Sequence, residues 1–193
     1  GPKAAGPQQG IQAAMRGVTP LDKLLEVEEL LVKLIIHHGE KHIVVKDVEG
    51  NDIELPIAQY IYLDMSGDEF RFHNELYNRI LQETLEHLED ENFVAETYFA
   101  NHPDPEVSRI ASLPTGEQEV STASLQLQLN AEKLRQFVFK DLLSFRTHYI
   151  AQRLIEVQQE FARNPSNREL VEEFMKLKKM NSLLASQTNS VFN

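Results

Sequence analysis

The chain has no cysteine among its 193 residues. This excludes disulfides and metal sites built on thiolates, and it fits a reducing, cytoplasmic compartment. Long hydrophobic runs are also missing. The most apolar stretch, LLVKLIIHH, contains a lysine and is far shorter than the roughly 20 residues of a membrane-spanning helix. We find no signal peptide either. The sequence therefore predicts a cytoplasmic protein without membrane contact.

Familiar catalytic motifs are absent as well. There is no phosphate-binding G-x-x-x-x-G-K-[ST], no nucleophile G-x-S-x-G and no D-x-D of the kind that holds Mg²⁺. The acidic residues between positions 75 and 91 read as the solvated face of a helix. We therefore predict that this chain is not an enzyme, and we assign no catalytic, cofactor-binding or metal-binding residue.

The charge of the chain is −11 and is unevenly distributed. Residues 20–108 contain 21 acidic and 6 basic side chains, whereas residues 109–163 contain 6 and 7, and residues 164–193 contain 3 and 4. An acidic body repels nucleic-acid backbones, so we expect no strong direct binding of DNA or RNA. The nearly neutral C-terminal part is better suited to meet another protein. Alternatively, the acidity only keeps the body soluble.

The segment FANHPDPEVSRIASL alternates His102, Asp104 and Glu106 with two prolines. These side chains could form a metal or acid–base site, or they could join two helices. Asp104 is suited to an N-cap, Pro105 to the first helical position, and Glu106 to the positive end of the helix dipole. Every polar residue then has a structural task, so the pattern favours a joint.

Three histidines near the end of the first predicted helix are a second candidate for metal binding. His38 and His42 have the i, i+4 spacing of a helical metal pair, but Gly39 interrupts the helix between them. We therefore favour a role at the helix end for His37 and His38, where a histidine meets the negative end of the dipole.

Residues 1–18 are rich in Gly, Pro, Ala and Gln and predict a flexible linker. A helix follows, with a capping box from Thr19 to Asp22 and its end at Gly39. β-Branched residues around EGND predict a small β-hairpin near residues 42–55. Apolar spacing then predicts further helices within PIAQYIYLDMSG, HNELYNRILQETLEHLED, VAETYFAN and PEVSRIASL. PTGEQEVSTAS, at residues 114–124, predicts a loop.

Residues 131–163 lack glycine and proline and keep an apolar stripe, which predicts one long helix. Pro165 ends it, and a capping box from Ser166 to Glu169 opens the last helix. The last helix should return antiparallel to the long one. The expected fold class is all-α, with a helical bundle followed by a long helix and a C-terminal antiparallel helical hairpin. The domain boundaries that we predict are 1–18, 19–128 and 129–193.

The order of these segments resembles a known family. EELLVKLIIHHG, EFRFHNELYNRILQETLEH, YFANHPDPEVSRIASL, EKLRQFVFKDLLSFRTHYIAQRLIEVQQE and ELVEEFMKLKKMNSLLAS occur as in the C-terminal, helicase-binding region of bacterial DNA primase, the DnaG type. NHPDPEVSR is the most specific patch. The resemblance runs from about Leu21 to Val191, but it carries no expectation for the segment HIVVKDVEGNDIEL.

The resemblance implies a non-catalytic interaction module that binds the N-terminal domain of the replicative, DnaB-type helicase and couples primer synthesis to the replication fork. A projecting hairpin buries little by itself, so its apolar side chains need a partner. Alternatives are the N-terminal collar domain of a helicase, which oligomerises, and a helical fragment of an unrelated enzyme. The residues that we predict to bind the partner lie on the last helix: Leu170, Phe174, Met175, Leu177, Lys178, Met180, Leu183 and Leu184.

Overall fold

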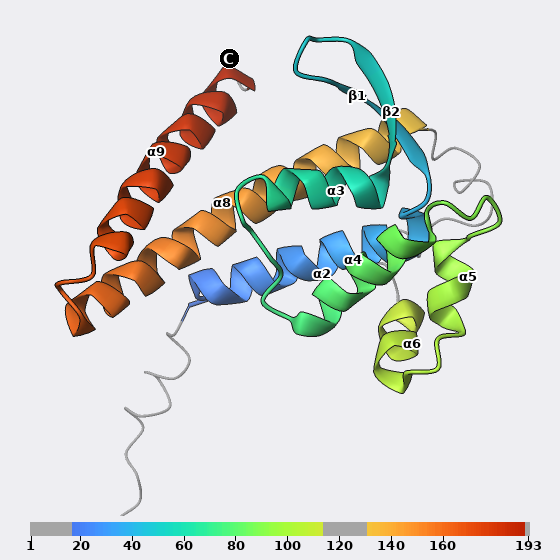
Figure 1. The fold of residues 1–193 in the computed structure, drawn as a ribbon, viewed down its shortest axis with the longest axis horizontal. Helices are drawn as coiled ribbons and strands as arrows, with labels where there is room; N and C mark the ends of the chain where they lie inside the picture. The colour runs from blue at the N-terminus through green and yellow to red at the C-terminus, as the bar shows by residue number, and fades with distance from the viewer. Residues whose placement is uncertain (1–16, 114–130, 192–193) are drawn as a thin grey trace, which may run out of the picture. The chain divides into compact units, whose positions relative to one another are not determined.

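The computed structural model describes residues 17–113 and 131–191, and the chain divides into two compact units. Of the described residues, unit 1 contains 17–26 and 147–191, and unit 2 contains 27–113 and 131–146. The helices among them account for most of the described chain, which confirms the all-α class (Figure 1). None of these helices is both long enough and apolar enough to cross a membrane. Most of the predicted linker and the whole predicted loop 114–124 lie outside the described residues.

The first helix, α2, runs from Pro20 to His38 and begins as the sequence predicts. The Asp22 backbone N–H donates to Thr19 Oγ1 at 3.1 Å, and the Thr19 N–H donates to an Asp22 carboxylate oxygen at 3.0 Å. This reciprocal capping box satisfies two backbone donors that the start of a helix leaves free. The Thr19 bonds also lower the pKa of Asp22.

The residue after α2 is Gly39, and its backbone lies too close to Ile35 and Thr84 to leave room for a side chain. A Cβ at this position would lie 2.4 Å from the Ile35 carbonyl oxygen and 2.9 Å from the Thr84 methyl group. The Gly39 N–H donates to the Ile35 carbonyl, and the Gly39 carbonyl accepts from the Ala58 N–H. The reason for glycine here is therefore close packing.

The predicted β-hairpin is confirmed. Strand β1, His42–Lys46, pairs antiparallel with β2, Asp52–Pro56, in a register that places Val44 opposite Glu54. Gly50 adopts a φ of 84° in the turn, where the Asp47 carboxylate accepts from the backbone N–H groups of Glu49 and Asn51. Ile43 and Val45 are buried, so one face of the hairpin packs into unit 2.

The rest of unit 2 is formed by α3 (Ile57–Ser66), α4 (Glu75–His87), α5 (Ala95–Ala100), α6 (Pro105–Ser112) and the first half of α8 (Ala131–Arg163). The four short helices lie within the segments that the sequence predicts, and α8 has the predicted bounds. Figure 1 shows the β-hairpin extending past α3. The core of unit 2 consists of apolar side chains from α2 and these helices. Among them are Ile35, Ile61, Ile80, Phe99, Val107, Val138, Leu142 and Phe145.

Arg146 attaches the first half of α8 to the end of α3. Its guanidinium donates to the Asp64 carbonyl oxygen at 3.2 Å, bonds the Asp68 carboxylate and lies 5.2 Å from the Phe70 ring centroid. Burial raises the pKa of Asp64, and Arg146 opposes that rise. The first half of α8 thus belongs to unit 2, so the two units do not follow the boundary near residue 128 that we predict from the sequence.

Unit 1 contains the second half of α8 and the last helix, α9, which spans Arg168–Val191. A turn of four residues joins them, and α9 starts beside the end of α8 and runs back along it (Figure 1). This is the predicted antiparallel helical hairpin.

Candidate functional site

The turn of the helical hairpin is capped differently from our expectation. The backbone N–H of Glu169 donates to Asn167 Oδ1 at 3.1 Å, so Asn167 is the N-cap of α9. The Ser166 hydroxyl instead donates to Asn164 Oδ1 at 3.0 Å. The predicted Ser166–Glu169 box is therefore wrong by one residue. The physical reason is that asparagine is as good an N-cap as serine, and α9 begins one residue later.

The inner face of α9 is defined by Leu170, Leu177 and Leu184, which are all buried. Their spacing of seven residues keeps them on one side of the helix. On α8, Ile150 and Val157 are buried with the same spacing. Phe161, which the sequence places on the same stripe, is exposed.

A charged clamp joins the two helices. The Arg153 Nε donates to Glu173 Oε1 at 2.6 Å, and a terminal nitrogen of Arg153 donates to Glu173 Oε2 at 2.9 Å. The other terminal nitrogen bonds Glu156 and Glu160 on α8 itself. These bonds, chiefly those to Glu173, raise the pKa of the guanidinium. A fork–fork pair of this kind fixes the register of α9 along α8.

The eight predicted partner-binding residues do not share one face. Leu170, Leu177 and Leu184 are buried, so they stabilise unit 1 and are not available to a partner. Phe174 and Met180 are half-buried. Met175, Lys178 and Leu183 are exposed.

Two further exposed residues, outside the predicted set, lie on the same side of α9. Val171 and Lys179 are exposed and fall at positions three to four residues from Met175 or Leu183. They could have been selected only if the buried side of α9 had been known, because the sequence does not show which side faces α8. We define the outer face of α9 as Val171, Met175, Lys178, Lys179 and Leu183.

The outer face combines exposed apolar side chains with charged ones, most of them lysines. The exposed fractions of Val171, Met175 and Leu183 are 46%, 64% and 56%. Three lysines lie between residues 176 and 179, and the exposed Glu172 lies three residues before Met175 on the same side of the helix. The Lys178 ammonium lies 5.5 Å from the Phe174 ring centroid, so its aliphatic stem follows the helix surface. Such a surface suits an apolar partner surface that also carries carboxylates.

In unit 2, the segment around His102 joins α5 to α6, as predicted. Asp104 is the N-cap of α6 and accepts from the Glu106 N–H at 3.0 Å, with Pro105 at the first helical position. The His102 ring accepts from the Asp104 N–H at Nδ1 and donates from Nε2 to Glu83 at 2.8 Å. The His102 imidazole thus links the joint to α4.

Arg79 strengthens the same joint. It donates to Asp104 at 2.7 Å and to Glu83 at 2.9 Å. The Arg79 bond and the Glu106 N–H lower the pKa of Asp104. Partial burial raises the pKa of Glu83, but the bonds from Arg79 and His102 outweigh it and leave that pKa below its usual value.

His37 and His38 lie in the last turn of α2, as predicted. His38 is mostly buried, and burial, Lys41 and His37 lower its pKa to about 4. It is therefore neutral at pH 7, and it accepts from the Lys41 ammonium at 2.8 Å. The expected favourable charge at the helix end is thus absent for His38. Within the described residues, no three His, Asp or Glu side chains come together as metal ligands.

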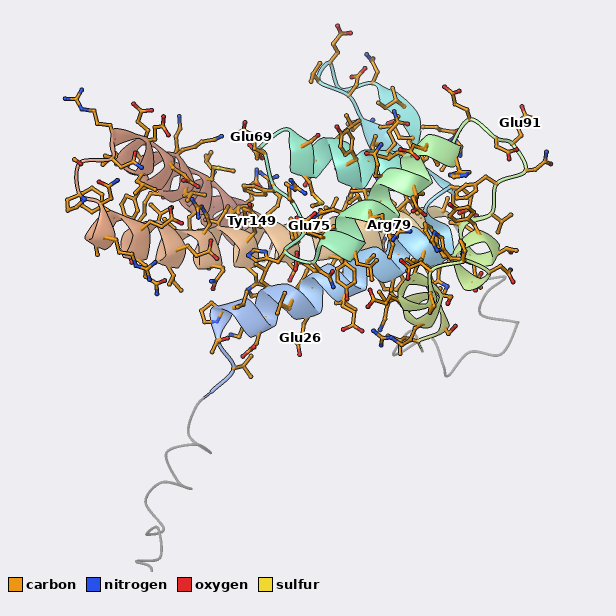
Figure 2. The ribbon with its side chains drawn as sticks, turned by 60° about the horizontal axis from the view of Figure 1, so that its bottom comes forward. Glu26, Glu69, Glu75, Arg79, Glu91 and Tyr149 are labelled. Atoms are coloured by element: carbon orange, nitrogen blue, oxygen red, sulfur yellow. The ribbon has the colours of Figure 1, made fainter. Side chains whose placement is uncertain are left out.

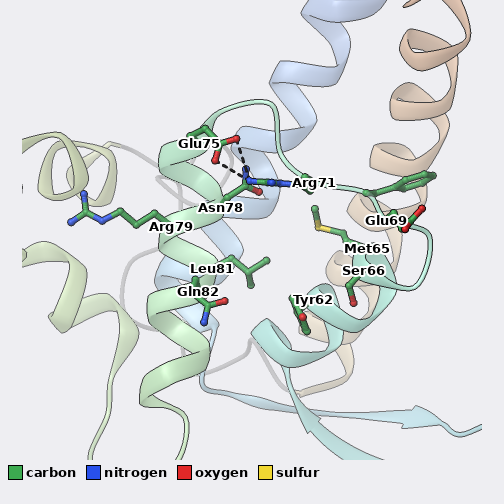
Figure 3. Close-up of a pocket in the computed structure, with 11 residues that line it drawn as sticks. Tyr62, Met65, Ser66, Glu69, Arg71, Glu75, Asn78, Arg79, Leu81 and Gln82 are labelled. Atoms are coloured by element: carbon green, nitrogen blue, oxygen red, sulfur yellow. Dashed lines mark hydrogen bonds and ion pairs between the residues drawn. The ribbon is translucent and has the colours of Figure 1, made fainter. Parts of the chain in front are cut away.

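A groove of about 550 Å³ lies between α3 and α4 in unit 2 (Figure 3). Its apolar floor is made by Met65, Phe70 and Leu81, which are all buried. Tyr62, with an exposed fraction of 43%, stands at its mouth. The size is typical of pockets that receive a ligand or an anchoring side chain.

The rim of this groove is charged. Arg71 donates twice to the Glu75 carboxylate, at 3.0 and 3.2 Å. Glu69 is exposed and adopts a φ of 60°, a conformation that is uncommon for residues other than glycine. Arg79 extends away from the groove toward Asp104 (Figure 3). No sequence motif marks this groove, because its residues come from two helices and the loop between them.

Comparison with known proteins gives one family match, over residues 14–191, to a family described as a domain of unknown function (DUF8430). The match covers both units. No curated protein and no solved structure matches the chain.

Proposed function

The chain belongs to the DUF8430 family, and we propose that it is a non-catalytic interaction module that binds the replicative DNA helicase. In this proposal it acts as the C-terminal region of a DnaG-type primase and couples primer synthesis to the replication fork. The N-terminal domain of the helicase is the partner. The chain needs no cofactor for this role.

The observation that carries the proposal is the outer face of α9. Three large apolar side chains, Val171, Met175 and Leu183, are exposed on a helix whose opposite side is buried. Exposed apolar groups that gather on one surface are typical of protein interaction sites. An amphipathic helix that lies in a groove of its partner uses anchors at this spacing.

The architecture of unit 1 supports the same proposal. The Arg153–Glu173 clamp and the buried leucines hold α9 rigidly, so the outer face loses little conformational entropy when a partner binds. The lysines near Met175 favour a partner surface with carboxylates and increase the rate of encounter with it.

The test is isothermal titration of the chain with the N-terminal domain of the replicative helicase from the same organism. We expect binding, and we expect Met175→Ser with Leu183→Ser to weaken it by at least ~10-fold, as for the loss of interface anchors. The matched control is Leu30→Ser on α2, which also removes an exposed leucine but lies in unit 2. The control should bind like the wild type. If the wild-type chain does not bind the helicase, the proposed function fails. If both variants bind equally well, only the assignment to the outer face fails.

A further inference from the structure

We propose that Glu28 and the loop between α3 and α4 form a latch that is closed when Glu28 is protonated and opens as the pH rises. The loop spans residues 67–74. In the closed form, the His73 backbone N–H donates to Glu28 Oε1. This inference goes beyond the proposed function, because it concerns an equilibrium within unit 2 and needs no helicase.

The Glu28 carboxylate is buried on the side of α2 that meets the end of this loop. Its exposed fraction is 0%, and among the described residues Oε2 has no hydrogen-bond partner. Figure 2 shows Glu75, the first residue of α4, beside α2, and Figure 1 shows the same two helices side by side. A buried carboxylate with one donor for two oxygens is costly as an anion and much less costly when it is protonated.

The titratable and charged groups nearby do not replace the missing bond. From the loop, His73 Nδ1 lies 3.8 Å from Glu28 Oε1, and the imidazole stabilises the anion only when it is itself protonated. From α4, Tyr77 stays neutral, because burial and the charges of Glu29 and Glu28 raise its pKa. Arg109 on α6 only opposes that rise. Burial raises the pKa of Glu28, although the His73 N–H and imidazole act in the other direction.

Opening of the latch lets water reach both oxygens of Glu28. The open form then binds the proton with the ordinary pKa of 4.5, whereas the closed form binds it more tightly. A rise of the pH above 4.5 therefore favours the open form, by up to ~10-fold per pH unit, until the closed form has also lost its proton. Below pH 4.5 both forms are protonated, so the latch is closed most firmly there.

The movement is confined to a short part of the loop. The Asn78 side chain accepts from the Phe72 N–H at 2.9 Å and donates to the Phe72 carbonyl at 2.8 Å, and the Phe72 ring is buried. Phe72 therefore stays in place when His73 leaves α2. Arg71 and Glu75, which form an ion pair on the rim of the groove between α3 and α4, each lie two residues from His73. The latch thus makes the rim of this groove sensitive to pH.

The test is amide hydrogen exchange of the full chain, followed by NMR from about pH 4.5 to about pH 8. The protection factor, which removes the intrinsic effect of pH on exchange, reports the closed latch at the His73 amide, because this N–H bonds Glu28. We expect it to fall by up to ~10-fold per pH unit above pH 4.5 and then to level off. The Phe72 amide is the control within the same chain, because its acceptor, Asn78, does not titrate. Its protection factor should stay constant.

Two variants assign the effect to Glu28. Glu28→Gln keeps an oxygen for the His73 N–H but does not titrate, so the protection factor of the His73 amide should become independent of pH. Glu29→Gln removes the neighbouring carboxylate of α2 and should leave the fall as in the wild type. If Glu28→Gln does not fold, the comparison of the His73 and Phe72 amides in the wild type still decides.

Three results would overturn the proposal. The first is a protection factor of the wild-type His73 amide that stays constant with pH. The second is a fall that the Phe72 amide shares, since this would show that a larger part of unit 2 opens. The third is a fall that persists in Glu28→Gln.

Discussion

At the scale of single residues, the least expected feature is a fully buried carboxylate in α2. Glu28 has an exposed fraction of 0% and accepts a bond from the His73 backbone N–H through Oε1. Among the described residues, its Oε2 has no hydrogen-bond partner. Burial raises the pKa of Glu28 above its ordinary value of 4.5, although the His73 N–H and the His73 imidazole act in the other direction. A buried charge without full pairing destabilises the fold.

This residue makes stability depend on pH. Because the pKa of Glu28 is higher in the folded chain, its stabilising contribution is fully present below pH 4.5 and is lost as the pH rises through the folded pKa. Glu28→Gln keeps an oxygen for the His73 N–H but does not titrate. We therefore expect the melting temperature of Glu28→Gln, relative to that of the wild type, to increase as the pH rises from about 4.5 through the folded pKa and to level off above it.

Thermal melts at several pH values check this prediction, with Glu29→Gln as the control at a partly exposed neighbour that pairs with Lys33. The difference between control and wild type should change much less. If the difference in melting temperature between Glu28→Gln and the wild type stays constant with pH, the pKa of Glu28 is the same in the folded and the unfolded chain, and the prediction is wrong.

A second prediction concerns the joint at Asp104. Asp104→Ala loses both the N-cap of α6 and the bond from Arg79, whereas Asp104→Asn keeps an N-cap oxygen and loses only the charge. We expect Asp104→Ala to lower the melting temperature by about 3 °C, as for loss of one cap in a chain of this size, and Asp104→Asn to lower it less. Differential scanning calorimetry gives both values. Equal losses in both variants would mean that the ion pair, not the cap, stabilises the joint.

The sequence predicts interactions between residues that are close in sequence well, and interactions between residues far apart in sequence poorly. The caps at Thr19 and Asp104 follow from residues within four positions, so the pattern alone predicts them. The bond from His102 to Glu83 spans 19 positions and has no local signature. For the same reason, the contact of Glu28 with His73 and the groove at Tyr62 could not be predicted.

At the scale of whole elements, periodicity predicts where helices lie but not always which side they bury. All 33 residues of α8 follow from the lack of glycine and proline and from its apolar stripe. The last helix carries apolar residues on more than one side, so its pattern does not decide between them. The buried leucines and the Arg153–Glu173 clamp determine its orientation, and these contacts depend on α8.

A third prediction tests this division of α9 into two faces. Leu177→Ala removes a buried side chain of unit 1 and should destabilise the chain by about 2–5 kcal/mol. Met175→Ala removes an exposed one and should change stability by less than about 0.5 kcal/mol. Urea unfolding of both variants measures these values. Similar losses at both positions would contradict the assignment of inner and outer faces.

At the scale of the whole molecule, charge separates the two units. The described part of unit 2 is strongly acidic, whereas the described part of unit 1 has as many basic as acidic side chains. Composition alone predicts this contrast. It does not predict that Ala131–Arg146 belongs to unit 2, because the first half of α8 joins that unit through side chains far away in sequence, such as Asp64 and Phe70.

The last prediction separates the contributions of the two units. Removing every residue after Arg163 deletes α9 and leaves unit 2 with its complete set of buried residues. We therefore expect the shortened chain to remain helical and to unfold cooperatively. The end of α8 should fray, because Arg153 loses Glu173 and Val157 loses the buried leucines of α9 nearby. Circular dichroism should thus lose more helix than the 24 residues of α9 contribute.

Binding to the helicase should disappear in the same shortened chain, because the outer face of α9 is gone. Isothermal titration with the helicase N-terminal domain measures this loss, and the Leu30→Ser variant again serves as the control for exposed apolar surface. If the shortened chain folds but keeps its full affinity, the partner must contact unit 2 or what remains of unit 1, residues 17–26 and 147–163. The groove at Tyr62 and Glu69 would then be the first surface to mutate, since it combines an apolar floor with charged side chains at its rim.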